Sequence, residues 1–238
     1  MPFRGRLSDR LGSRAGQPVS EDMRGRELLL NLLTNVMSWS CAAAAADRLI
    51  EEFDDFAGVV SADFHQLCQA PYLTVRQSRL LKAIHEAALH LTMVRLEAAP
   101  VLDQSKLVMD YLNARLGHCE VEEFHALFLD AQHRLIASEH LATGAVTEVP
   151  VVPAQVLRRA LLLNAAGIVL VHNHPSGHAA PSDSDIQRTY EIQALAADMG
   201  VVLHDHIIIA RGGHASMRQL GLLLPPGSSR FPWRAGGQ

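Results

Sequence analysis

The stretch Val169-Leu170-Val171-His172-Asn173-His174-Pro175-Ser176-Gly177 is the most informative part of this sequence. A short apolar run precedes two histidines, and a run of this length predicts a buried strand. Because His172 and His174 are one residue apart, their side chains point to the same side and can converge at the carboxyl end of the strand. The proline and glycine that follow predict a fixed loop in place of a continuing strand.

A carboxylate follows the histidines after this loop. Asp185 lies eleven positions after His174, at the start of an amphipathic run that predicts a helix. Two imidazole nitrogens and one carboxylate oxygen are the protein ligands of many hydrolytic zinc sites, where the fourth position is left to water. Zinc in such a site lowers the pKa of that water toward about 7. The pattern therefore predicts a zinc-dependent hydrolase site formed by His172, His174 and Asp185.

Each part of this pattern also has a plain structural interpretation. Ser182 and Asp185 have the spacing of a helix N-cap and its N3 carboxylate, which needs no metal ion. His172 alone is typical of a buried, hydrogen-bonded histidine, and Pro-Ser-Gly alone is typical of a turn. Non-haem iron could use the same ligands, although an oxygenase triad usually has its carboxylate two residues after the first histidine. The combination of a strand-end histidine pair, a stiff loop and a carboxylate entering a helix favours the zinc site.

Composition is typical of a compact globular protein. Of the 238 residues, 48% are hydrophobic, and no apolar run approaches the ~20 residues of a membrane span. Because no signal-peptide pattern is visible, a cytoplasmic protein without membrane association is predicted. The formal net charge of −4 argues against a general nucleic-acid binder. The three cysteines are far apart and indicate neither a disulfide framework nor a cysteine zinc site.

The chain is predicted to have a helical first part. Apolar residues recur at three-to-four spacing and predict an all-helical bundle over residues 21–98, with Ser40 as the cap of its second helix. Ala98-Ala99-Pro100 interrupts the helical pattern and predicts the domain boundary. Residues 1–20 are predicted to be a tail or a short helix, and residues 223–238 a flexible tail.

After this boundary the hydrophobic period changes. Helices are predicted over residues 107–116, from Pro153, and from Ser182 onward. Between and after them the strands are predicted at residues 121–129, 135–137, 146–149, 168–171, 201–203 and 207–209. This alternation predicts a mixed α/β layer domain with its site at the strand ends, next to a helix amino terminus.

The residues around the histidine pair resemble a known family. His172-x-His174, with Ser182 and Asp185 downstream, is similar to the signature of JAMM (MPN-plus) metalloproteases, and His172–Gly177 with Pro181-Ser182 resembles their bacterial RadC branch. The resemblance covers roughly residues 101–222 and implies a JAMM/MPN fold, which is a cytidine-deaminase-like mixed-sheet α/β domain. It also implies a zinc metallopeptidase or isopeptidase that acts on a peptide or protein substrate, with zinc held by His172, His174 and Asp185.

The resemblance implies two further catalytic residues. The family's catalytic carboxylate lies on the first strand two residues before a Phe, and Phe124 places it at Glu122. Such a group takes the proton of the attacking water and returns it to the leaving amine. Glu123 is the alternative, but alternation along a strand sends it to the opposite face. Ser182 in this family helps to hold the water or the developing oxyanion. His206 is predicted to be a core or supporting histidine and not a fourth ligand.

The amino-terminal helices resemble the helix-hairpin-helix segment that precedes the metal domain in RadC proteins. In that motif a Gly-hydrophobic-Gly turn offers backbone N–H groups to a DNA phosphate. This chain has Tyr72-Leu73-Thr74 at the corresponding turn, so the glycines are absent. The family's DNA-repair naming gives the alternative function, a DNA-associated repair or recombination accessory protein with a structural metal domain. The missing glycines leave packing or partner binding by the helices as an equally open interpretation.

Overall fold

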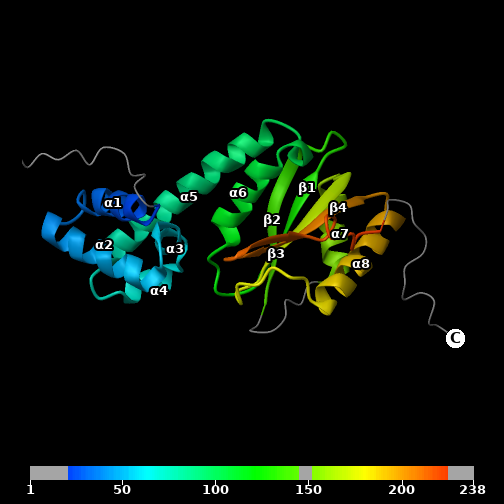
Figure 1. Ribbon diagram of the computed structural model, residues 1–238. Helices are drawn as coiled ribbons and strands as arrows, with labels where there is room; N and C mark the ends of the chain where they lie inside the picture. The colour runs from blue at the N-terminus through cyan, green and yellow to red at the C-terminus, as the bar shows by residue number, and fades with distance from the viewer. Residues whose placement is uncertain (1–20, 145–151, 225–238) are drawn as a thin grey trace, which may run out of the picture. The chain divides into compact units, whose positions relative to one another are not determined.

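The structure is a computed structural model that describes residues 21–144 and 152–224 (Figure 1). It shows a helical amino-terminal region followed by a mixed α/β sheet domain, as predicted. The chain divides into two compact units, Met1–Val59 and Val60–Gln238, and the boundary predicted at residues 98–100 falls within the second. The segments predicted at residues 1–20 and 146–149 lie outside the described residues, as does the tail predicted at 223–238 beyond its first two residues.

The described part of the first unit consists of two helices and the start of a third. Helix α1 spans Glu21–Leu33, α2 spans Trp39–Phe53, and α3 spans Phe56–Ser61. Ser38, and not Ser40, is the N-cap of α2, because Ser38 has an extended backbone and its side chain accepts a hydrogen bond from Cys41 N. An N-cap residue must have this non-helical backbone, and Ser40 already lies inside the helix.

The second unit begins with two helices that start at capping boxes. Helix α4 spans Phe64–Gln69 and α5 spans Val75–Glu97. At their starts, Gln66 Oε1 accepts a hydrogen bond from Asp63 N at 3.0 Å, and Gln77 Oε1 accepts one from Thr74 N at 2.7 Å. The turn at Tyr72-Leu73-Thr74 joins these two helices, and DNA contact there stays a prediction. No helix among the described residues has the length and apolar character of a membrane span.

A mixed five-stranded sheet forms the centre of the second unit. Its strands are β1 (Glu123–Leu129), β2 (Leu135–Thr143), β3 (Gly167–Asn173), β4 (Val202–Ala210) and β5 (Gly213–Ser216), in the order β2-β1-β3-β4-β5. Only β3 and β4 pair in parallel. The two strands predicted at 201–203 and 207–209 are one strand, because Asp205 between them is satisfied by Ser216 Oγ at 2.6 Å and by Arg218 N at 3.0 Å.

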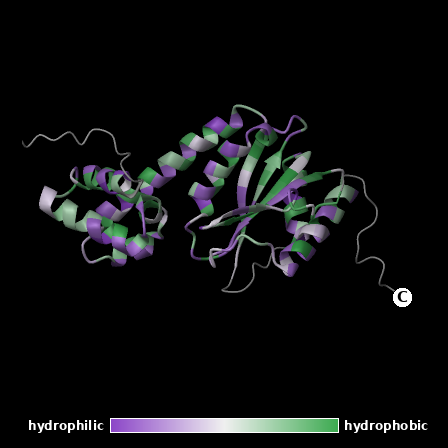
Figure 2. Cartoon of the chain, in the orientation of Figure 1, coloured by the Kyte–Doolittle hydropathy of each residue, from purple (hydrophilic) through white to green (hydrophobic). Residues whose placement is uncertain are grey.

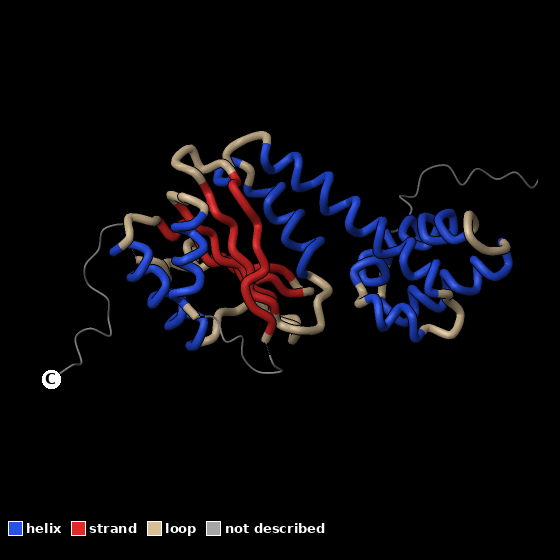
Figure 3. Tube along the Cα trace, turned by 180° about the vertical axis from the view of Figure 1, so that it is seen from behind, coloured by secondary structure: helices blue, strands red, loops and turns tan. Residues whose placement is uncertain are grey.

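Helices cover both faces of this sheet (Figures 1 and 3). The remaining helices are η1 (Val101–Asp103), α6 (Ser105–Leu116), α7 (Pro153–Leu162) and α8 (Asp183–Asp198). Alternate residues of β1 enter two different cores: Phe124 and Phe128 pack with residues of α7 and α8, whereas Leu127 packs with residues of α5 and α6. Figure 2 shows apolar residues concentrated along the strands between these layers. All seven residues of β3 are buried, as expected for a strand covered on both faces.

Candidate metal centre

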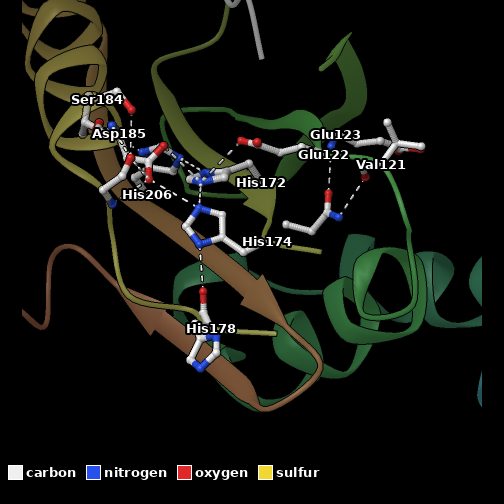
Figure 4. Close-up of polar contacts among 12 residues, drawn as sticks. Val121, Glu122, Glu123, His172, His174, His178, Ser184, Asp185 and His206 are labelled. Atoms are coloured by element: carbon white, nitrogen blue, oxygen red, sulfur yellow. Dashed lines mark hydrogen bonds and ion pairs between the residues drawn. The ribbon is translucent and has the colours of Figure 1, made fainter. Parts of the chain in front are cut away.

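The structure brings together the three predicted zinc ligands (Figure 4). His172 lies at the end of β3, His174 in the loop that follows, and Asp185 in the first turn of α8. His172 Nε2 lies 2.9 Å from His174 Nε2 and 3.3 Å from Asp185 Oδ1, and His174 Nε2 lies 3.4 Å from Asp185 Oδ2. Ligands in a tetrahedral zinc site lie about 3.4 Å from one another. The spacing of the three side chains is therefore close to that of a zinc site.

A chain of buried hydrogen bonds determines which nitrogen of His172 faces the centre. Thr189 Oγ1 donates to the main-chain carbonyl of Asp185 at 2.6 Å, and its other close contact, Met217 Sδ, can also only accept. Thr189 must therefore accept from His206 Nδ1, at 2.5 Å. Burial lowers the pKa of His206 well below its ordinary value, so this neutral ring accepts at Nε2 from His172 Nδ1, at 2.8 Å. The lone pair of His172 is consequently on Nε2, which faces the centre.

The ring of His174 also turns its Nε2 toward the centre. Its Nδ1 donates to the main-chain carbonyl of His178 at 2.8 Å, which leaves the lone pair on Nε2. A proton on Nε2 would be hydrogen-bonded to Asp185, and this interaction raises the pKa of His174 against the opposing effect of burial. Two imidazole lone pairs and a carboxylate so close together need a positive charge between them, either a proton or a metal ion. This donor set fits a divalent cation such as Zn²⁺.

Asp185 serves as both a helix cap and a member of the metal centre. Its Oδ2 accepts hydrogen bonds from Ser182 N at 2.8 Å and from Ser182 Oγ at 2.6 Å, while Asp185 N donates to Ser182 Oγ at 3.2 Å. Burial would raise the pKa of Asp185, but the hydrogen bonds that His172 and His174 donate from Nε2 when their rings are protonated hold it well below its usual range. The capping interpretation and the metal interpretation therefore describe the same carboxylate, which the cap holds in position.

The two neighbouring glutamates point to opposite sides of the sheet. Glu122 Oε1 lies 4.0 Å from His172 Nε2, and the Glu122 side chain is 21% exposed (Figure 4). Glu123 instead accepts a hydrogen bond from His125 Nε2 at 2.9 Å. Glu122 is thus the glutamate that lies near the predicted ligands, and its catalytic role stays a prediction.

Asn173 holds the segment that carries Glu122. This buried side chain accepts a hydrogen bond from Glu123 N at 2.8 Å and donates to Val121 O at 3.0 Å and Cys119 O at 3.3 Å. Sequence reasoning missed this role, as it missed the part of Thr189. The signal for Asn173 was its position between two ligands on a strand, because alternation turns it away from the metal centre and toward the neighbouring chain segment.

Comparison with known proteins gives the family. The family model described as the RadC-like JAB domain matches residues 102–222, which include every residue of the candidate metal centre. The chain belongs to the RadC family. This RadC-family chain is 38% identical to a UPF0758 protein of Rhodobacter capsulatus over 86% of its own length and 95% of that protein. It is 39% identical to a UPF0758 protein of Leptothrix cholodnii over 83% of its own length and 89% of that protein.

Proposed function

We propose that this RadC-family chain is a zinc-dependent hydrolase that cleaves an amide bond in a peptide or protein. The observation that carries the proposal is the convergence of two imidazole lone pairs and one carboxylate within 2.9–3.4 Å, at the carboxyl end of the central strand β3 and next to a helix amino terminus. A site with three protein ligands leaves one coordination position for water or substrate, which is the arrangement of catalytic and not of structural zinc.

The residues of the centre would have two different roles, metal binding and proton transfer. His172, His174 and Asp185 would hold the zinc ion, which supplies a Lewis acid and makes a water acidic enough to attack near neutral pH. Glu122 lies farther from His172 than the three ligands lie from one another, which favours a proton carrier over a fourth ligand. Glu122 would accept the proton of the attacking water and return it to the leaving nitrogen.

These roles favour a substrate that is cleaved at an amide bond. An amine is a poor leaving group unless it is protonated, so amide hydrolysis benefits from a carboxylic acid that can return a proton at the site. Ser182 stands beside Asp185 at the exposed start of α8. Its hydroxyl would assist by holding the water or the developing oxyanion, in addition to its role as the helix cap.

Metal content tests the ligand assignment. The full-length protein is purified without chelators, dialysed against zinc-free buffer and compared with His174→Ala, which is expected to carry one zinc ion fewer per chain. His178→Ala is the matched control, because His178 contributes only its main-chain carbonyl to the centre. If His174→Ala retained as much zinc as the unsubstituted protein, the ligand assignment would be wrong.

Hydrolysis tests the role of Glu122. Glu122→Gln is expected to keep its zinc and to lose cleavage of peptide and isopeptide substrates by 100-fold or more, because the amide cannot carry the proton (about 10²–10⁴-fold for a general acid/base). Loss of zinc together with activity would instead indicate that Glu122 is a ligand.

A further inference from the structure

Three side chains of the types that can ligate a metal ion meet on the face of the sheet opposite the candidate metal centre. Glu123 and His125 are two residues apart on β1, so strand alternation sends both to the same face. His140 on β2 is the direct cross-strand partner of His125, and such partners lie close enough for their side chains to meet. One ligand atom from each of the three residues lies within 4.8 Å of the others.

The face is identified by the neighbours of these residues. Leu127, which follows His125 by two positions on β1, packs in the core formed with α5 and α6. Ser138, which precedes His140 by two positions on β2, contacts the hydroxyl of Tyr111 on α6 at 3.2 Å. The cluster therefore lies on the α5–α6 side of the sheet, whereas His172 lies on the α7–α8 side with Phe124 stacked against it.

Each of the three side chains is held by a neighbour. His125 Nε2 lies 2.9 Å from Glu123 Oε2, the same spacing as between the two histidines of the candidate metal centre. The rings of His125 and His140 meet edge to face with their centroids 5.0 Å apart. His140 Nε2 contacts Thr143 Oγ1 at 2.9 Å, which orients its ring as supporting hydrogen bonds do at metal sites.

The buried part of the cluster has the ionisation state that metal ions require. Burial lowers the pKa of His125, so its imidazole is neutral near pH 7. A hydrogen bond with His125 lowers the pKa of Glu123 despite partial burial, and Arg115 on α6 adds a smaller effect in the same direction. A neutral imidazole and an ionised carboxylate are the forms in which these groups bind metals.

We propose that Glu123, His125 and His140 form a second zinc site. Two imidazoles and one carboxylate are a common zinc ligand set, and an open coordination position would be filled by water. The contact between Glu123 and His125 alone would be an ordinary hydrogen bond. That pair does not account for the third donor, His140, which the strand register brings to the same point and which is exposed enough for an ion to enter. The proposal does not depend on the hydrolase function.

Three protein ligands would leave this second site an open position, as at a catalytic zinc ion, but its place between two paired strands indicates that the ion would serve to hold Glu122 in position. The site lies where the pairing of β1 with β2 shifts register, between Phe124 and His125. At the same point the main-chain carbonyl of Glu122 accepts a hydrogen bond from Gly144 N at 2.7 Å. A metal ion that joins β1 to β2 here would fix the backbone of Glu123. It would thereby hold the adjacent Glu122 in place.

Zinc stoichiometry separates the two sites. After dialysis against zinc-free buffer, the full-length protein is expected to carry two zinc ions per chain, His140→Ala one, His174→Ala one, and the double variant none. His140 is exposed, so its replacement leaves the fold intact, and circular dichroism checks this. His90→Ala, at an exposed histidine of α5, is the matched control and should carry two.

The outcomes for the two proposals differ. If His140→Ala carries as much zinc as the unsubstituted protein, the second site does not exist, whatever His174→Ala shows. If His140→Ala loses one zinc ion and His174→Ala loses none, the second site stands and the hydrolase proposal falls. In a chelator competition, His140→Ala should weaken zinc binding at this site by more than the ~10–100-fold that loss of a supporting hydrogen bond causes, because it removes a ligand.

Discussion

Glu122 and Glu123 are adjacent in the chain, yet they belong to two different clusters on opposite faces of one sheet. The cluster near Glu122 gathers residues from the end of β3, the loop after it and the first turn of α8. The cluster of Glu123 draws only on two paired strands. The first therefore exists only when distant elements pack correctly, whereas the second follows from strand alternation and register alone.

The two clusters also differ in their support. In the first, the rings of His172 and His174 are each oriented by a hydrogen bond, and His172 is backed by a buried chain through His206 and Thr189. In the second, His140 is exposed, and the hydrogen bond that orients its ring is to the neighbouring Thr143. Because preorganised ligands lose less freedom on binding, we expect tighter zinc binding at the first cluster.

Asp185→Asn should give the largest difference between the clusters. Asparagine keeps the shape of the side chain and can still accept a capping hydrogen bond, but it removes the charge and the ligand oxygen. Zinc binding at the first cluster should fall by more than about 100-fold, the upper limit for loss of a mere supporting contact, while the second keeps its affinity. Chelator competition measures the first cluster alone on the His140→Ala background, and the second cluster alone on the His174→Ala background. Equal losses at both clusters would contradict their independence.

Asn173→Ala should lower the stability of the segment that carries Glu122 and Glu123, one residue of each cluster, because Asn173 holds this segment in place. The substitution leaves Glu123 N and the carbonyls of Val121 and Cys119 without their partner. A fully buried group left unsatisfied costs about 1–3 kcal/mol, and because these three groups are only partly buried, the free energy of unfolding should fall by about 2–3 kcal/mol in total.

Urea denaturation measures this loss of stability. The control is Asn113→Ala on the exposed surface of α6, which should change the free energy of unfolding by less than about 0.5 kcal/mol. An equally small effect of Asn173→Ala would mean that the segment before β1 is held by other contacts.

Thr189→Val tests the buried chain of hydrogen bonds that orients His172 in the first cluster. Valine has nearly the same shape but cannot accept from His206 Nδ1, so the ring of His172 loses its fixed tautomer. Zinc affinity at the first cluster should fall about 10–100-fold, as for other residues that orient a ligand. Thr189→Ser keeps the hydroxyl and should restore most of the affinity. Unchanged zinc affinity in Thr189→Val would show that the chain of hydrogen bonds through His206 does not position His172.

The sequence predicted what depends on short spacing. His172 and His174 on one strand, the stiff loop and the carboxylate at the helix start could all be recognised from local patterns, and the structure brings them together. The choice of Glu122 over Glu123 came from the resemblance to the family, and alternation added only that the two glutamates point to opposite faces. Ser38 was missed as a cap because two serines lie at the start of the helix, and only the backbone conformation distinguishes them.

The supporting residues could not be predicted, because their partners are distant in the chain. His206 contacts His172 from 34 positions away, and Asn173 reaches back 50 positions to Glu123. The pairing of His125 with His140 depends on a strand register that a bulge shifts, and no spacing rule fixes such a shift. Strand pairing and tertiary packing therefore determine both the support of the first cluster and the existence of the second.

Ser182→Ala should have the smallest effect and separates the cap from the metal site. The variant loses the hydroxyl that caps α8 and bonds Asp185 Oδ2, which should lower the free energy of unfolding by about 1 kcal/mol. Ser182 N still donates to Asp185, so the carboxylate keeps its position, and zinc affinity at the first cluster should change by less than about fivefold. Thermal unfolding and chelator competition on the same sample give both values. A large loss of zinc without a loss of stability would mean that the hydroxyl holds the metal site directly and that capping is incidental.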